Sequence, residues 1–108
     1  MHETIENRLR VSEAEIADFC RRWQISELAL FGSVLRDDFR PDSDIDVLVT
    51  FAPDSRWSLI DHIAIERELA ELLGRPVDLV SKRAVEKSDN WIRRKEILDT
   101  ALPVYVSG

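Results

Sequence analysis

The stretch Ser43-Asp44-Ile45-Asp46-Val47-Leu48-Val49-Thr50 carries the clearest local pattern in this sequence. Apolar residues at every second position alternate with Asp44 and Asp46, which is the period of a strand with one buried face. Side chains two residues apart in a strand project from the same face, so the two carboxylates are expected side by side, with Cα atoms about 6.6 Å apart. The stretch therefore predicts a strand that presents an acidic pair.

This acidic pair is typical of a metal site. At an effective dielectric near 20 the two carboxylates repel each other by about 2 kcal/mol unless a cation lies between them. Mg²⁺ prefers one or two protein carboxylates and fills its other positions with water and phosphate oxygens. Asp78, in the later apolar run 77–80, adds a third carboxylate. Three such ligands can hold two metal ions roughly 3.5–4 Å apart for phosphoryl or nucleotidyl transfer. The alternative interpretation is that the pair is only the solvated face of an edge strand.

A second functional pattern lies upstream, where the short apolar run 28–31 ends at Gly32 and Ser33. Gly32 lets the backbone approach a phosphate closely, and the amide and hydroxyl of Ser33 can donate hydrogen bonds to it at the start of a short helix. Arg36, about one turn further on, can add a planar fork for phosphate oxygens, or can form a salt bridge to a neighbouring aspartate. A metal pair beside a phosphate cradle is what binding of a nucleoside triphosphate requires.

The remaining periodicities predict a mixed α and β order with too few strands for a doubly wound sheet. We expect an α+β (mixed α/β) fold, in which a small mixed sheet carries the carboxylates on one side and packs its helices on the other. A single domain over residues 1–108 is expected. Helices are predicted over 12–23, 58–73 and 90–101, and strands over 28–31, 44–50 and 77–80.

The composition is that of one ordinary globular domain, with 108 residues of which 44% are hydrophobic. The net charge of -6 is opposite in sign to the surface that binds nucleic acid, so no direct nucleic-acid binding is expected. Cys20 is the only cysteine, and there is neither a signal-like segment nor a long apolar run. We expect a soluble cytoplasmic protein that binds no membrane.

The motifs together resemble a known family. Gly32-Ser33-x-x-Arg36, then Ser43-Asp44-Ile45-Asp46, then Val77-Asp78-Leu79-Val80, are similar to those of the DNA polymerase β-like nucleotidyltransferase superfamily. The resemblance is closer to the minimal nucleotidyltransferases (MNT), which are encoded beside HEPN-domain partners in prokaryotic toxin–antitoxin pairs. It runs over nearly the whole chain.

The resemblance implies a role for each matching residue. Gly32 and Ser33 would hold the β- and γ-phosphates of ATP, and Asp44 and Asp46 would bind Mg²⁺. Asp78 would complete the metal site and take the proton from the attacking hydroxyl. The implied activity is that of an antitoxin, which transfers AMP from ATP to a tyrosine of a HEPN toxin and forms a hetero-oligomer with it.

One position departs from the family, because Asp37 stands where many members have Gly and adds a negative charge near the triphosphate. Two alternatives stay open for the function. The chain could be a non-catalytic antitoxin that neutralises its partner by binding, or a nucleotidyltransferase for a small molecule of the aminoglycoside type. The chain is too short for a substrate lobe of its own, which favours an acceptor presented by a partner protein.

Several residues outside these motifs have more than one interpretation. His62 and Glu66, four apart on a helix, are expected to be a hydrogen-bonded structural pair rather than an acid and a base. Arg94 is either part of a solvated helix end or a cation that reaches the triphosphate or the toxin. Apolar spacing predicts core positions for the following residues, whereas Trp57 is left open: Cys20, Trp23 and Trp91.

Overall fold

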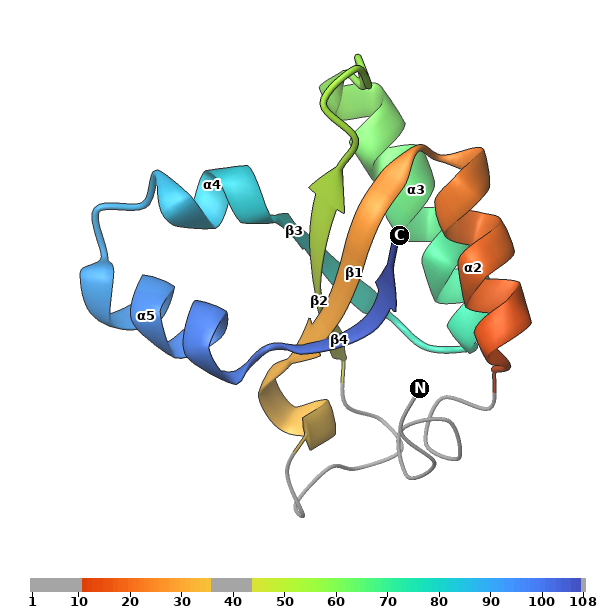
Figure 1. The fold of residues 1–108 in the computed structure, drawn as a ribbon. Coiled ribbons are helices and arrows are strands. Elements are labelled where there is room, and N and C mark those ends of the chain that lie inside the picture. The colour runs from red at the N-terminus through yellow and green to blue at the C-terminus, as the bar shows by residue number, and fades with distance from the viewer. Residues whose placement is uncertain (1–10, 36–43, 108) are drawn as a thin grey trace.

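The computed structural model describes residues 11–35 and 44–107. They form one four-stranded sheet, in the order β3-β2-β1-β4, with helices on both of its sides (Figure 1). The elements are α2 (Glu13–Arg22), β1 (Ile25–Phe31), the 3-10 helix η1 (Gly32–Leu35), β2 (Ile45–Phe51), α3 (Leu59–Leu73), β3 (Val77–Ser81), α4 (Lys82–Glu86), α5 (Trp91–Thr100) and β4 (Leu102–Val106).

The sheet is mixed, as the sequence predicts. β1 lies antiparallel to both β2 and β4, whereas β2 and β3 run parallel. Parallel neighbours need a crossover, and α3 supplies it between β2 and β3. The predicted α+β fold class is therefore confirmed.

The two long helices begin and end at residues that the sequence identifies. Ser12 and Glu15 form a capping box at the start of α2, and Ser58 and Asp61 form the same motif at the start of α3. Gly74 ends α3 in the left-handed conformation, with φ of 70°. Local capping chemistry thus places both predicted helices to within about two residues.

Two apolar clusters lie on opposite faces of the sheet. The larger one joins α2 and α3 to the sheet and includes Phe19 and Ile65, both fully buried. The smaller one joins α4 and α5 to the other face through Phe31, Leu48 and Ile97. Helices were expected on one face only; α2 and α3 follow that expectation, but α4 and α5 cover part of the face that carries Asp46, because Leu48 makes that face apolar further along β2.

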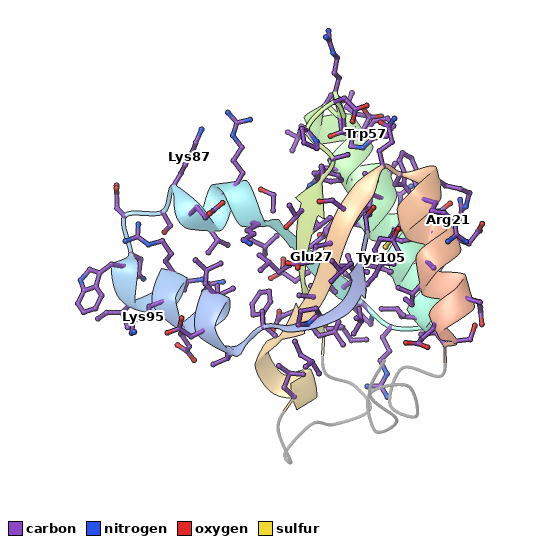
Figure 2. The ribbon with its side chains drawn as sticks, viewed as in Figure 1. Arg21, Glu27, Trp57, Lys87, Lys95 and Tyr105 are labelled. Atoms are coloured by element: carbon purple, nitrogen blue, oxygen red, sulfur yellow. The ribbon has the colours of Figure 1, made fainter. Side chains whose placement is uncertain are left out.

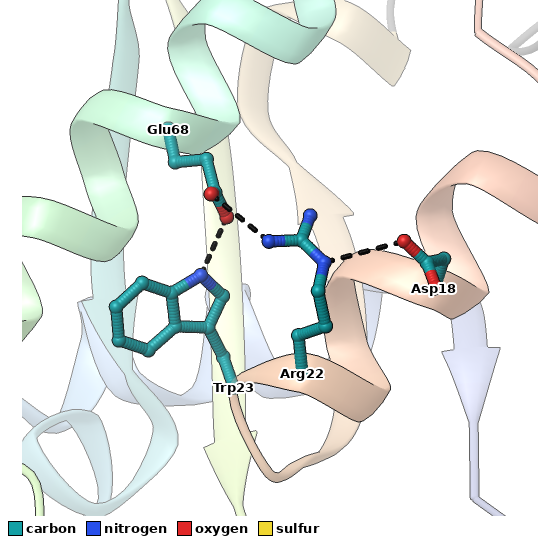
Figure 3. A network of polar contacts seen from close by, with 4 residues as sticks. All are labelled: Asp18, Arg22, Trp23 and Glu68. Atoms are coloured by element: carbon teal, nitrogen blue, oxygen red, sulfur yellow. Dashed lines mark hydrogen bonds and ion pairs between the residues drawn. The ribbon is translucent and has the colours of Figure 1, made fainter.

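A polar network joins the end of α2 to α3 (Figure 3). The indole Nε1 of Trp23 donates to Glu68 Oε2 at 2.5 Å, and the Arg22 guanidinium bridges Glu68 and Asp18 at 3.0 and 3.2 Å. Trp57, labelled in Figure 2 where β2 leads into α3, donates from Nε1 to the Trp23 carbonyl at 2.7 Å. The two indole rings meet edge to face with centroids 5.3 Å apart. Trp57 is therefore a structural residue in this fold.

The core positions predicted from apolar spacing are only partly confirmed. Cys20 is fully buried and Trp23 packs against the larger cluster. Trp91 is 61% exposed, so its predicted core position is wrong. The cause is that α5 contacts the sheet through Ile97, near its other end, whereas Trp91 begins the helix away from the sheet. Of the helices described here, none has the length and apolar character needed to cross a membrane.

Candidate active site

Asp46 and Asp78 lie opposite each other in the parallel β2–β3 pair. Residues in register on neighbouring strands present their side chains on the same face, so the two carboxylates point into the same region. Both line a cavity of about 510 Å³ between this face, the end of β1 and α5. The structure thus brings together two of the three carboxylates predicted to bind metal.

Gly32 closes one side of this cavity at the end of β1. Its φ of 77° is in the region that glycine adopts without strain. A Cβ atom at this position would lie 3.2 Å from Asp46 Cγ and closer still to Oδ2. The turn therefore needs glycine both for its positive φ and for the space next to Asp46. Because Gly32 has no side chain, its backbone lies directly against the Asp46 carboxylate.

Asp44 occupies a different position from the other two carboxylates. It is exposed and lies just before β2, two residues from Asp46, but it is not among the residues that line the cavity. Within residues 11–35 and 44–107, no three His, Cys, Asp or Glu side chains gather closely enough to hold a metal ion. The three-carboxylate metal site remains a prediction, for which Asp46 and Asp78 supply two oxygen donors of the kind that Mg²⁺ prefers.

The predicted phosphate cradle is described only in part. The backbone of Ser33 belongs to η1, the turn of 3-10 helix that follows β1, as the predicted short helix requires. The side chain of Ser33 lies outside the described structure, and so do Arg36 and Asp37. Their roles toward phosphate remain predictions.

α5 contributes cavity residues that the sequence motifs do not indicate. Arg93, Glu96 and Thr100 line the cavity together with Ile97. Their spacing of three and four residues places them on one side of the helix, which is the only sequence signal that could have identified them. Among the described lining residues Arg93 is the only cation, so this helix brings a positive charge toward the acidic pair.

Arg94 does not reach the cavity. Its Nη1 donates to the carbonyl of Ser88 at 3.1 Å and more weakly to that of Glu86 at 3.5 Å. These carbonyls belong to the connection between α4 and α5. Arg94 therefore stabilises this loop, and the hypothesis that it reaches toward the triphosphate is wrong; the adjacent Arg93 faces the cavity instead.

His62 and Glu66 are structural hydrogen-bonding residues, as expected, but they bond to a strand rather than to each other. The Nε2–H of His62 donates to the Leu79 carbonyl at 2.9 Å. Glu66 Oε2 accepts from the Leu79 N–H at 2.8 Å. Both contacts fall on the residue that follows Asp78 in β3.

Comparison with known proteins agrees with this arrangement. The family model described as nucleotidyltransferase domain matches residues 14–102. Protein adenylyltransferase MntA from Thermococcus cleftensis is 37% identical over 84 residues, which cover 78% of this chain and 80% of that protein.

Two solved structures share the fold. A protein assigned as a minimal nucleotidyltransferase superimposes with a TM-score of 0.67 at 32% identity, covering 94% of this chain and 96% of that one. A structure of a tri-AMPylated Shewanella oneidensis HEPN toxin in complex with MNT antitoxin matches with a TM-score of 0.60 at 23% identity, covering 88% of this chain and 70% of that one.

Three observations agree: the mixed sheet, the Gly32 turn against Asp46, and the register of Asp46 with Asp78. The family match spans most of the chain and includes all of these residues. The chain therefore belongs to the nucleotidyltransferase domain family, and it is a nucleotidyltransferase similar to the minimal members of that family.

Proposed function

We propose that this chain is an antitoxin that transfers AMP from ATP to a tyrosine hydroxyl of a HEPN-domain toxin. The observation that carries the proposal is the pairing of Asp46 with Asp78 at a cavity whose wall is the Gly32 turn. This arrangement puts acidic oxygens beside a backbone that can approach phosphate, which is what nucleotidyl transfer from a triphosphate requires.

The nucleotide would bind with its triphosphate against the Gly32 turn. Gly32 and Ser33 would hold the β- and γ-phosphates through backbone amides, and Arg36 would add a guanidinium fork. Arg93 lines the same cavity and would contact the phosphates from the opposite wall. A cation is needed there because Asp46, Asp78 and the triphosphate all carry negative charge.

Asp46 and Asp78 fit the ligand preference of Mg²⁺, and Asp44 would join them from the start of the strand. When bound, Mg²⁺ would neutralise charge on the α-phosphate and on the departing pyrophosphate. The residues of the chain would hold the triphosphate so that its α-phosphorus faces the incoming hydroxyl.

In the transfer step, the tyrosine oxygen would form a bond to the α-phosphorus while the bond to the β-phosphate oxygen breaks. The electron pair of that bond leaves with pyrophosphate. Asp78 would take the proton of the tyrosine hydroxyl, since its side chain is exposed and lies at the cavity. The products are an AMP-tyrosine and pyrophosphate.

The acceptor is proposed to come from a partner protein, with which the chain would form a hetero-oligomer. The supporting relatives are a protein named as a protein adenylyltransferase and an antitoxin complexed with an AMPylated HEPN toxin. We also propose that the chain acts as a single domain. The proposed location is the cytoplasm, because the one cysteine of the chain is buried and unpaired, as is usual in a reducing compartment.

The test is transfer of label from [α-³²P]ATP to the product of the adjacent gene. The wild-type chain should label that protein in the presence of Mg²⁺, and Asp46→Asn and Asp78→Asn should each reduce the rate by about 100-fold or more. Asp54→Asn is the matched control, because Asp54 is exposed and lies outside the cavity. It should label at the wild-type rate.

Two results would contradict the proposal. If Asp46→Asn and Asp78→Asn still relieve growth arrest by the toxin as well as wild type does, the chain neutralises by binding alone. If label enters a small-molecule acceptor and never the neighbouring protein, the acceptor class is wrong.

A further inference from the structure

Two side chains of α3 bind the same backbone residue of β3. The Leu79 carbonyl accepts from His62 Nε2–H at 2.9 Å, and the Leu79 N–H donates to Glu66 Oε2 at 2.8 Å. His62 and Glu66 are four residues apart, so they lie one above the other on one side of the helix. Together they use both polar groups of one peptide residue.

These hydrogen bonds occur at the outer edge of the sheet. β3 is the last strand in the order β3-β2-β1-β4, so within residues 11–35 and 44–107 no strand pairs with the outer half of its backbone groups. Because both polar groups of Leu79 bond to α3, they point away from β2. At Leu79, side chains of α3 therefore make the two hydrogen bonds that a further strand beside β3 would make.

Leu79 is directly linked to the proposed active site. Its side chain is 4% exposed and belongs to the larger apolar cluster. Successive side chains in a strand point to opposite faces, so Asp78 faces the cavity while Leu79 faces the core. Any shift of the Leu79 peptide along the strand or out of the sheet moves Asp78 relative to Asp46, its register partner.

α3 is a suitable support for such a contact because it is itself firmly packed. Ile65 and Leu69 are fully buried, and Leu73 is nearly so, against the same face of the sheet. His62 and Glu66 are partly buried beside this apolar row. The position of the two polar side chains is therefore set by the core, not by the cavity.

We propose that His62 and Glu66 are positioning residues for nucleotidyl transfer: by holding the Leu79 backbone they keep the Asp78 carboxylate opposite Asp46. This inference rests on the proposed function, because it assumes that Asp78 acts with the metal. Neither His62 nor Glu66 lines the cavity that contains Asp46 and Asp78, so their effect reaches the site through the strand.

The test uses two pairs of substitutions. Glu66→Leu removes the acceptor for the Leu79 N–H, whereas Glu66→Gln keeps an amide oxygen that can accept the same bond. His62→Leu removes the donor for the Leu79 carbonyl, and His62→Gln keeps a terminal N–H at similar reach. Glu68→Leu is the control on the same helix, because the hydrogen bonds of Glu68 go to Trp23 and Arg22.

Three measurements separate positioning from general stability. Binding of Mn²⁺ with AMP-PNP, followed by electron paramagnetic resonance, reports the metal site without an acceptor. Amide exchange of Leu79, followed by nuclear magnetic resonance, reports the hydrogen bond itself. Thermal unfolding by circular dichroism shows that each variant is folded and how much stability it has lost.

We expect Glu66→Leu and His62→Leu to weaken Mn²⁺ binding by about 10- to 100-fold, the range for partners that orient metal ligands. Glu66→Leu should also speed exchange of the Leu79 amide. Both Gln variants should restore wild-type binding. Glu68→Leu should lower the unfolding temperature and leave Mn²⁺ binding unchanged. If His62 and Glu66 contributed to stability alone, their leucine variants would behave in the same way as Glu68→Leu.

Other outcomes would overturn the proposal. Leucine variants that are folded and bind Mn²⁺ as tightly as wild type would show that Asp78 does not depend on these contacts. Weakening by Glu68→Leu equal to that by Glu66→Leu would show a nonspecific effect of stability. A wild-type chain that binds no Mn²⁺ would instead contradict the proposed function, and with it this inference.

Discussion

The substitution Gly32→Ala tests whether the close approach of the η1 turn to Asp46 matters for activity. Two effects are expected. The first is backbone strain, because φ at this residue is 77° and alanine disfavours that region by about 1–2 kcal/mol. The second is contact, because the new Cβ would lie 3.2 Å from Asp46 Cγ and overlap Oδ2. The Asp46 side chain must rotate away to make room.

Gly74→Ala separates these two effects. Gly74 has a similar φ of 70°, but nothing lies within 4 Å of the Cβ that alanine would add. Alanine also lowers the conformational entropy of the unfolded chain, which stabilises the folded state by about 0.4–1 kcal/mol. The free energy of unfolding should therefore fall by about 1 kcal/mol in Gly74→Ala. Gly32→Ala adds about 0.5–1.5 kcal/mol for moving Asp46 from its rotamer. The melting temperature should fall by about 4–8 °C per kcal/mol in both variants.

Activity should distinguish the two variants far more than stability does. A carboxylate displaced by about 1 Å can cost about 100-fold in rate, so Gly32→Ala should lose about this factor in AMP transfer. Gly74→Ala should keep the wild-type rate at temperatures where it is folded. The measurements are initial rates with [α-³²P]ATP and thermal unfolding of the same samples. Equal rates for the two alanine variants would refute the argument that this turn controls the position of Asp46.

Three further predictions follow from particular contacts. Burial raises the pKa of Glu68, but hydrogen bonds from Trp23 and the arginine beside it outweigh this and hold the folded-state pKa below its ordinary value. The stabilisation by these hydrogen bonds should be complete above about pH 4.3 and be lost as the pH falls through the lower folded-state pKa. Trp23→Phe should lower the free energy of unfolding by about 1 kcal/mol at pH 7, and in urea unfolding experiments this free energy should fall less steeply at acidic pH than in the wild type. Burial raises the pKa of Cys20 to about 12, so iodoacetamide at pH 8 should label it only after unfolding; rapid labelling of the native chain, seen by mass spectrometry, would contradict its buried position. Arg93→Gln should raise the KM for ATP about tenfold, because Arg93 lines the cavity. Arg94→Gln should lower the melting temperature and leave the KM unchanged, because Arg94 bonds to the loop between α4 and α5. The reverse pattern would show that Arg94, not Arg93, contacts the nucleotide.

Local patterns in the sequence were sufficient for most elements. The alternation around Asp46 predicted β2, the capping box of Ser12 and Glu15 predicted the start of α2, and Gly74 predicted the end of α3. These patterns work because strand period and helix capping depend on residues within four positions of each other. α4 was not predicted, since five residues are too few to show a helical period.

Long-range contacts decided which side chains share the cavity. The sequence offered Arg94 as a cation for the site, but Arg94 binds the loop carbonyl of Ser88, and it is Arg93 that lines the cavity with Asp46. One residue changes the direction of a helical side chain by about 100°, and only the packing of Ile97 against the sheet sets that rotation.

The residues of the candidate site could therefore be named from the sequence alone: an acidic strand, a glycine turn before it and a third carboxylate on a later strand. The tertiary structure decided their arrangement, by pairing β2 with β3 in the register that sets Asp46 against Asp78 and by tying Leu79 to α3. Composition and spacing are local properties of a chain, whereas register and edge contacts depend on residues far apart in sequence that meet only when the core packs.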